Sequence, residues 1–352
     1  MNRQSGITVI EILVGLALSL IILAGVLHIF INNKQTYRVQ EAFARLQENG
    51  RFAMQFITKD LRMAGYMGCA GKITNPIGNI ADYYPKDGEV DLAASFNGVG
   101  IEGYRYTDLP LQLTNTTSLN TTNVAEDTDI VQIKRASTTG ARVRNPPTPT
   151  PPSNPELKLD RDLSEGLFEQ YDILFVSDCE NADVFVASDV SANSGSIYRT
   201  ITLAASTNYA PPGSPPRISD YDEDAEVYKL VNTTYYIGIN SAGQPALFRK
   251  FLSNANNIIE EELVEGVEDM QILYGEDTDD DGTPNRYVDL DDIPTPPVDW
   301  NKVVSVRIEL GLRSIEDNLA AEPKPVPNQP TVMDRRLRRT FTTSIAIRNR
   351  AI

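Results

Sequence analysis

The stretch GITVIEILVGLALSLIILAGVLHIFI, residues 6–31, decides how this chain is organised. Its 25 residues from Ile7 to Ile31 are apolar apart from Glu11, His28 and a few small polar residues. About 20 such residues suffice for a helix to cross the hydrocarbon of a bilayer. The run exceeds the apolar core of a secretory signal and leads into INNKQTYRVQ rather than into a small-residue cleavage site, so we predict a retained membrane-spanning helix.

The same helix is predicted to continue beyond the membrane. Apolar or small residues recur at steps of three or four, and charged residues occupy the rest of the helical wheel. The recurring residues are Val39, Phe43, Leu46, Gly50, Ala53, Ile57, Leu61 and Ala64. We expect one helix from about Thr8 to Met63 that ends at Gly65, because glycine readily takes the left-handed conformation that closes a helix.

The rest of the chain has the pattern of β-strands and loops. Eight segments rich in β-branched and aromatic residues are candidate strands: residues 129–136, 171–178, 196–203, 226–239, 245–252, 267–275, 302–313 and 339–348. NSAGQ, between two of them, predicts a hairpin turn. Four Pro-rich stretches predict surface loops, at 144–155, 210–217, 293–298 and 322–330. The predicted fold class is α+β, a long N-terminal helix followed by a β-rich, antiparallel head over residues 65–352.

Charge and cysteine content narrow the functional classes. The chain has 352 residues and a formal net charge of −16, which argues against nucleic acid as a partner because phosphate binding relies on clustered Lys and Arg. Its two cysteines, Cys69 and Cys179, follow a membrane-targeting start, a context in which a pair usually forms a disulfide. The alternative is a pair of buried unpaired thiols.

The segment DTDDDGTPN has the spacing of a calcium loop. Asp277, Asp279 and Asp281 stand at positions one, three and five, Gly282 supplies the sharp turn, and Asn285 is at position nine. Position twelve is Val288 instead of a bidentate Glu, and the preceding segment has a strand pattern, so an EF-hand is excluded. Asp289 or Asp291 could supply the closing ligand. A weak calcium site and a solvated acidic turn both remain open.

The N-terminal sequence SGITVIEILVGLAL resembles the class III signal of type IV prepilins. The resemblance implies a leader of residues 1–6 cleaved after Gly6 by the prepilin peptidase, an N-methylated mature N-terminus at Ile7, and an assembly role for Glu11. Ile7 stands where Phe is commoner. The implied mature helix spans residues 7–64, with 7–31 in the membrane or filament core and 32–64 amphipathic.

Segments further along resemble a PilW-type minor pilin: residues 48–69, 176–179, 263–282, 303–314 and 338–349. The resemblance implies a subunit that helps to initiate a type IV pilus and forms part of its tip complex. The implied partners are other minor pilins, the major pilin, a large tip adhesin, the prepilin peptidase and the bacterial inner membrane. The head would lie in the periplasm before assembly and at the extracellular pilus tip afterwards.

Glu11 has a physical rationale within this resemblance. A carboxylate at the bilayer centre costs on the order of 2.5 to 3.5 kcal/mol, so a partner is expected. After cleavage the amine of Ile7 is a cation at similar depth, and it could be neutralised by Glu11 of a neighbouring subunit. The alternative is a glutamate that reaches the membrane interface by extending its side chain.

Two other functional classes are weighed against a pilus subunit. A type II secretion pseudopilin of the J type would share the signal and the β-rich head, although the chain length and the 276–282 and 342–349 segments argue against it. A membrane-anchored exported hydrolase would need catalytic groups in the head. His28, the sole histidine, lies in the membrane helix and no nucleophile motif is present, so we expect no enzyme activity.

Overall fold

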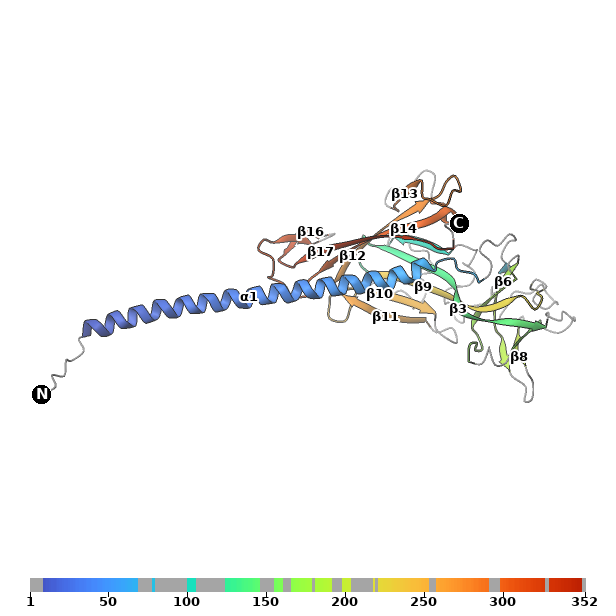
Figure 1. Ribbon diagram of the computed structural model, residues 1–352, viewed down its shortest axis with the longest axis horizontal. Helices are drawn as coiled ribbons and strands as arrows, with labels where there is room; N and C mark the ends of the chain where they lie inside the picture. The colour runs from blue at the N-terminus through green and yellow to red at the C-terminus, as the bar shows by residue number, and fades with distance from the viewer. Residues whose placement is uncertain are drawn as a thin grey trace. The chain divides into compact units, whose positions relative to one another are not determined.

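The computed structural model describes residues 9–68, 78–79, 100–105, 124–145, 155–160, 166–178, 181–191, 198–203, 218, 221–252, 258–290, 298–326 and 329–349. One helix, α1 (Val9–Arg62), precedes every described strand and is drawn in blue in Figure 1. A 3₁₀ turn, η4 (Trp300–Lys302), is capped by Asp299, whose side chain accepts from the Asn301 amide. The α+β class predicted from the sequence is confirmed.

The strands follow one another along the rest of the chain. They are β1 (Gly78–Asn79), β2 (Ile101–Arg105), β3 (Asp129–Asn145), β4 (Glu156–Asp160), β5 (Ile173–Ser177), β6 (Ala182–Val186), β7 (Asp189–Ser191), β8 (Tyr198–Thr202), β9 (Glu226–Ile239), β10 (Pro245–Leu252), β11 (Ile258–Glu265), β12 (Val267–Glu276), β13 (Arg286–Val288), β14 (Val303–Arg313), β15 (Lys324–Val326), β16 (Gln329–Asp334) and β17 (Arg338–Ala346). All eight predicted strands are present, and β9 and β10 have the predicted bounds.

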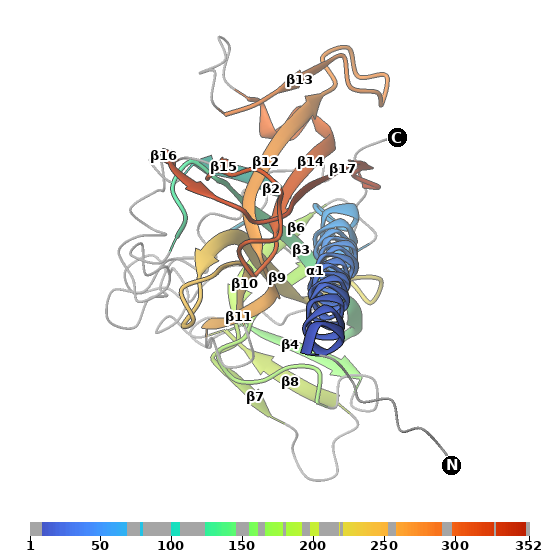
Figure 2. The same ribbon diagram turned by 90° about the vertical axis from the view of Figure 1, so that its left-hand side faces the viewer.

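Three sheets contain these strands. The largest has the order β1-β6-β5-β9-β3-β4-β8-β7, with β2 added to β3, β10 to β9 and β11 to β10. A four-stranded sheet has the order β13-β12-β14-β17, and its strand β12 also contacts β3, β9 and β10 of the largest sheet (Figure 2). The third is the β15–β16 ribbon. Pairing is antiparallel in every described register except that of β1 with β6, which is parallel.

The chain divides into two compact units. The smaller comprises Met1–Glu48 and Arg313–Arg338, and the larger comprises Asn49–Leu312 and Arg339–Ile352. Inside the smaller unit, Arg38 forms a 3.0 Å ion pair with Glu316, and Gln35 donates a 3.1 Å hydrogen bond to the Asn318 carbonyl. These contacts tie the segment that contains β15 and β16 to the helix shortly after its apolar run.

The ribbon β15–β16 corrects one expectation. Residues 322–330 were predicted to be a loop because proline lacks the amide that a central strand needs. In the structure Pro325 pairs with Met333, in a ribbon that has edge positions only. Proline is tolerated there because its missing amide can face away from the partner strand.

Strands of two kinds form the core of the larger unit. Some, such as β14, alternate buried and exposed residues, and others are buried on both faces. β5 and β6 are buried throughout, as expected for inner strands of Val, Leu, Ile and Phe. The helix contributes Ala53, Ile57 and Leu61, which are 0% exposed. The predicted amphipathic face is therefore confirmed there, whereas Phe43 is an exception at 39% exposed.

The helix ends where the sequence predicted. After Arg62 the chain makes a turn in which the Tyr66 amide donates to the Met63 carbonyl, and Gly65 has φ 69°. The Gly65 amide donates to the Lys134 carbonyl on β3 at 3.0 Å. A left-handed glycine thus closes the helix and joins its end to the large sheet.

Candidate functional site

The apolar part of α1 is the first candidate site. Its most hydrophobic 18-residue window has a mean hydropathy of 2.7 and none of that window is buried, so by length and composition the helix could cross a membrane. Glu11 lies in the first helical turn and is exposed on the isolated chain. The predicted processing residues Gly6 and Ile7 lie outside the described residues.

The last turns of α1 are fixed to the large sheet by polar as well as apolar contacts. Asp60, 8% exposed, accepts a 2.7 Å hydrogen bond from the Tyr235 phenol and lies 3.6 Å from the Arg135 guanidinium. A buried carboxylate of this kind needs partners because desolvation is costly. The last turns of α1 and the large sheet are therefore held together by specific polar contacts as well as by apolar burial.

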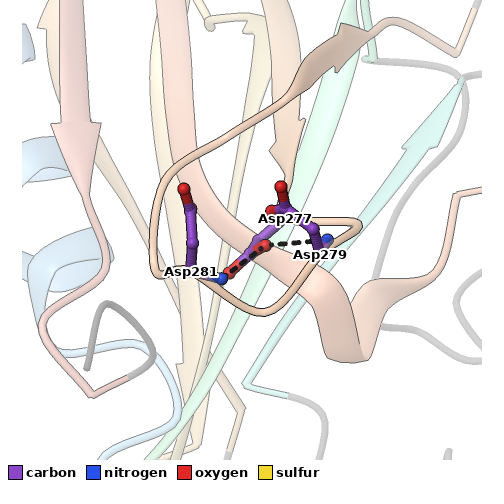
Figure 3. A group of neighbouring side chains, drawn as sticks. All are labelled: Asp277, Asp279 and Asp281. Atoms are coloured by element: carbon purple, nitrogen blue, oxygen red, sulfur yellow. Dashed lines mark hydrogen bonds between the residues drawn. The ribbon is translucent and has the colours of Figure 1, made fainter.

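The acidic loop Asp277–Asn285 is the second candidate site. It joins β12 to β13, whose register places Glu276 opposite Arg286 and Tyr274 opposite Val288. Ligand oxygens of Asp277, Asp279 and Asp281 all lie within 4.8 Å of one another. Figure 3 shows the three side chains on one turn of the loop. The structure therefore brings together the three carboxylates that the sequence singled out.

Backbone amides hold Asp277 in place. Its Oδ1 accepts from the amides of Asp279 and Asp281, each at 3.2 Å, which are the two dashed lines in Figure 3. Its Oδ2 accepts from the Gly282 amide at 2.7 Å. Burial tends to raise the pKa of Asp277, but the amide hydrogen bonds outweigh that effect and hold this pKa below its usual range. The carboxylate is thus kept ionised.

The loop also depends on unusual backbone conformations. Asp280 has φ 61° and Gly282 has φ 83°, so the turn passes twice through the left-handed region. Aspartate and glycine tolerate that region better than most residues. The spacing of aspartates and glycine in the sequence is thus the spacing that this turn requires.

The remaining predicted ligands are placed differently. The Asn285 Oδ1 accepts from the Thr278 amide at 2.6 Å and from the Thr278 hydroxyl at 3.0 Å, so this residue closes the loop by a side-chain hydrogen bond. Val288 lies in β13 and offers no ligand. Asp289 does not lie with the three loop carboxylates; its charge instead raises the pKa of Asp129. Asp291 lies outside the described residues.

The arrangement can hold a hard cation only through an incomplete set of protein oxygens. Carboxylates at 2.3–2.6 Å are typical calcium ligands, and water completes an open coordination sphere. No complete ligand cage is present among the described residues of this hairpin. The loop is therefore built either for weak calcium binding or as an acidic turn that Asp277 stabilises by itself.

The two cysteines lie outside the described residues, but their neighbours do not. Gly68 lies so close to Tyr228 that an added Cβ would be 2.6 Å from the ring. Tyr228 pairs with Phe175, and Glu226 pairs with Ser177, two residues before Cys179. The chain segments that lead into Cys69 and Cys179 thus meet at the same end of β9.

A polar cluster that the sequence interpretation missed lies in the larger sheet. Lys134 on β3 is 0% exposed, and its Nζ lies 2.8 Å from Oε2 of Glu102 on β2. The Tyr104 phenol donates to the same oxygen at 2.6 Å. A lysine inside the apolar strand segment DIVQIKRA was the available signal, since a lysine is almost never fully buried without a partner.

In this chain an exposed helix of membrane-spanning length is followed by an antiparallel β-rich head. Residues 234–349 match the family model of PilW, described as type IV pilus-assembly protein W, and the resemblance to a PilW-type pilus protein is confirmed over that segment. The match covers β10 to β17 and the end of β9, and so includes the acidic loop. A search of curated proteins and a search of solved structures found no match.

The family match has functional consequences at a coarse level. The match of residues 234–349 supports an involvement of this chain in type IV pilus assembly, and the matching family is described as a pilus-assembly component. The apolar helix together with this family indicates a protein anchored to a membrane.

Proposed function

We propose that this chain is a minor pilin that helps to initiate type IV pilus assembly and forms part of the complex at the pilus tip. The proposal rests on one observation: the same chain contains a segment that matches PilW and an exposed apolar helix with Glu11 in its first turn. Such a helix can be held first by the bilayer and then by the equivalent helices of other subunits, because both surroundings are apolar.

Glu11 would act in the selection of neighbouring subunits. Cleavage between Gly6 and Ile7 by the prepilin peptidase would create a cationic amine about one helical turn from Glu11, at 1.5 Å of rise per residue. In the low dielectric of packed apolar helices, a carboxylate and an amine of adjacent subunits attract each other strongly, whereas an unpaired Glu11 would be costly. Pairing would therefore set the axial register of the incoming subunit.

The implied partners follow from this role. They are the other minor pilins, the major pilin and a large tip adhesin, with the head in the periplasm before assembly and at the pilus tip afterwards. The net charge of −16 supports partners that are proteins with basic surfaces in preference to nucleic acid.

The test compares Glu11→Ala with Glu41→Ala in cells that lack the native gene. Glu41 is an exposed glutamate on the same helix that pairs with Arg45, and exposed pairs of this kind contribute little to stability. We expect membrane insertion of both variants, few or no pili with Glu11→Ala, and normal pili with Glu41→Ala. Normal pilus numbers with Glu11→Ala would refute the assembly role.

A second measurement concerns processing. Intact mass of the membrane-extracted protein should show loss of residues 1–6 and gain of one methyl group. A full-length chain in cells with an active prepilin peptidase would contradict the prepilin assignment.

A type II secretion pseudopilin of the J type is the alternative from the same architectural class. Chemical cross-linking in cells, followed by purification of this chain, separates the two functions. Pilus subunits in the cross-linked complex support a minor pilin, and secretion-system subunits in their place would favour the pseudopilin. An exported hydrolase has no supporting constellation among the described residues of the head.

A further inference from the structure

A buried asparagine lies directly opposite the buried lysine of the large sheet. Lys134 on β3 and Asn232 on β9 are partners in the antiparallel register. Asn232 is 4% exposed, and neither its Oδ1 nor its Nδ2 has a hydrogen-bond partner. Buried side-chain amides are normally hydrogen-bonded, so this one needs an explanation.

The sheet geometry places three reactive groups on one face. Opposite residues of an antiparallel pair point to the same side, with Cβ atoms about 4.5–5.5 Å apart. Glu102 on β2 is opposite Gln132, two residues from Lys134, and therefore shares that face. Lys134 thus lies on the strand between Glu102, which its Nζ contacts, and Asn232, its direct register partner.

The surroundings of Lys134 favour the neutral, nucleophilic form of its side-chain amine. Removal from water lowers the pKa of Lys134, and the nearby Glu102 carboxylate only partly offsets this. The Glu102 Oε2 is within hydrogen-bond distance of Nζ and can take its proton. A buried lysine whose charge is disfavoured is the usual form of an activated amine.

We propose that Lys134 and Asn232 form an intramolecular isopeptide bond, with Glu102 as the proton carrier. The Nζ lone pair attacks Cγ of Asn232 after Glu102 has accepted one proton from the ammonium group. The Nζ–Cγ bond forms, the Cγ–Nδ2 bond breaks, and the proton on Glu102 passes to the departing nitrogen. A second proton then leaves Nζ by the same route, so that the nitrogen of Asn232 departs as ammonium and Glu102 is again a carboxylate.

The reaction needs no further reactant. Neither carbon nor nitrogen changes oxidation state, and an ammonium ion is the only species lost. The product replaces the lysine ammonium group and the unpartnered side-chain amide by one neutral amide, and the Glu102 carboxylate keeps its hydrogen bond from the Tyr104 phenol. It also joins β3 to β9 covalently, and β9 is the strand that pairs with β3, β5 and β10.

Lys250 is the natural control for the identity of the nucleophile. It lies on β10 opposite Thr234, on the other side of β9, and is 8% exposed. Burial also lowers its pKa, and its Nζ lies 4.0 Å from Glu260. It therefore shares the burial and a nearby carboxylate with Lys134, but it is not the direct register partner of Asn232.

The test is peptide mapping of the full-length protein extracted from membranes. We expect a branched peptide that joins the Lys134 and Asn232 segments, with a mass lower by one ammonia than the sum of the two segments. A succinimide at Asn232 would show the same loss without the branch. Recovery of both segments separately, with unmodified Lys134 and Asn232, would overturn the proposal without any variant.

Two variants then assign the roles. Lys134→Arg should abolish the branched peptide, and Lys250→Arg should leave it unchanged. A branch that survives Lys134→Arg, or that is lost with Lys250→Arg, would show that the assignment is wrong. Glu102→Gln should leave the two segments unlinked in folded protein, and full linkage in that variant would exclude Glu102 as the proton carrier.

Discussion

The phenol of Tyr235 donates a 2.7 Å hydrogen bond to the Asp60 carboxylate, and so ties the last turns of α1 to the middle of the large sheet. The two residues are 175 positions apart in the sequence. Asp60 is only 8% exposed, and its carboxylate also lies 3.6 Å from the Arg135 guanidinium. The last turns of α1 are thus held to the sheet by a buried polar contact that water cannot easily replace.

Tyr235→Phe should lower the free energy of unfolding by about 1–3 kcal/mol, the usual cost of leaving a buried polar group without its partner. Tyr274→Phe is the matched control, since the Tyr274 phenol is buried and has no hydrogen-bond partner. That variant should be neutral or stabilising. Urea unfolding of the detergent-extracted protein measures both, and equal losses would show that the Asp60 contact contributes nothing specific.

Gly100→Ala should destabilise the protein by about 2–3 kcal/mol, in the range for overpacked sites. A Cβ on Gly100 would lie 2.1 Å from the Gly65 amide nitrogen and 2.3 Å from its Cα, so backbone must move where the helix ends. Gly311→Ala is the control, because the nearest atom to its Cβ would be the Asp269 Cβ at 3.2 Å, a side-chain atom and not backbone. Thermal melting of the two variants should differ clearly, and a harmless Gly100→Ala would contradict the close approach.

Asp129 should make the stability of the protein depend on pH between about 4 and 6. Burial raises its pKa to about 6, although the Ile272 amide and the Arg105 guanidinium lower it; Asp269 and Asp289 raise it further. The folded state therefore holds the proton more tightly than the unfolded state, whose pKa is near 3.8. This group contributes stability that is fully present below about pH 4 and is lost as the pH rises through about 6.

The expected contribution is about 3 kcal/mol, since each pKa unit corresponds to 1.36 kcal/mol. Asp129→Asn keeps an oxygen that can accept from the Ile272 amide, which the carboxylate now does at 2.7 Å. Unfolding free energies measured from pH 4 to pH 7.5 should therefore vary less in that variant. An identical pH profile for both proteins would mean that Asp129 does not titrate in this range.

The loop Asp277–Asn285 should bind calcium weakly, in the range of roughly 10⁻⁴ to 10⁻³ M that is typical of open oxygen sites. Calcium at 100 times its dissociation constant would stabilise the protein by about 2.7 kcal/mol. Calorimetric titration and melting curves with and without a chelator measure this. Binding heat that is absent at several millimolar calcium, with an unchanged melting temperature, would leave a solvated acidic turn.

Two variants separate metal binding from loop structure. Asp279→Asn should weaken calcium binding with little effect on the calcium-free protein, because the Asp279 side chain is exposed. Asp277→Asn should destabilise the loop even without calcium, since three backbone amides donate to the Asp277 carboxylate. If Asp279→Asn binds calcium as the native protein does, the three carboxylates are not a joint site.

Cys69 and Cys179 should form a disulfide in protein taken from the periplasm. Gly68 and Ser177, close to the two cysteines in sequence, both lie near the start of β9. Closing a loop of about 110 residues would stabilise the fold by about 4–5 kcal/mol in the chain-entropy model. Peptide mapping without reductant should show the linked pair, and two free thiols would refute the prediction.

The helix and the order of the main strands were predictable because their signals are local. Steps of three or four residues specify one face of a helix, and β-branched segments bounded by turn residues specify strands. The turn at residues 240–244 was likewise predicted, and the Asn240 amide does donate to the Gln244 carbonyl there. The short strands β4, β7 and β13 were missed because three to five residues carry too little pattern.

The acidic loop was predictable for a similar reason. Its carboxylates alternate over five residues, and Gly282 supplies a left-handed turn at φ 83°. The sequence could not predict that the Asp277 carboxylate would accept hydrogen bonds from three backbone amides, or that Asn285 would accept one from the Thr278 amide. Those contacts depend on how the β12–β13 hairpin closes.

The sequence by itself determined the apolar helix with Glu11, the β-rich class of the head and the aspartate spacing of the loop, because each depends on residues near one another in the chain. Only the tertiary structure decided which distant residues meet. Pairing of β3 with β9 brings Lys134 opposite Asn232, and packing of α1 on the sheet brings Asp60 to Tyr235. Such contacts follow from strand register and close packing, which a linear pattern does not encode.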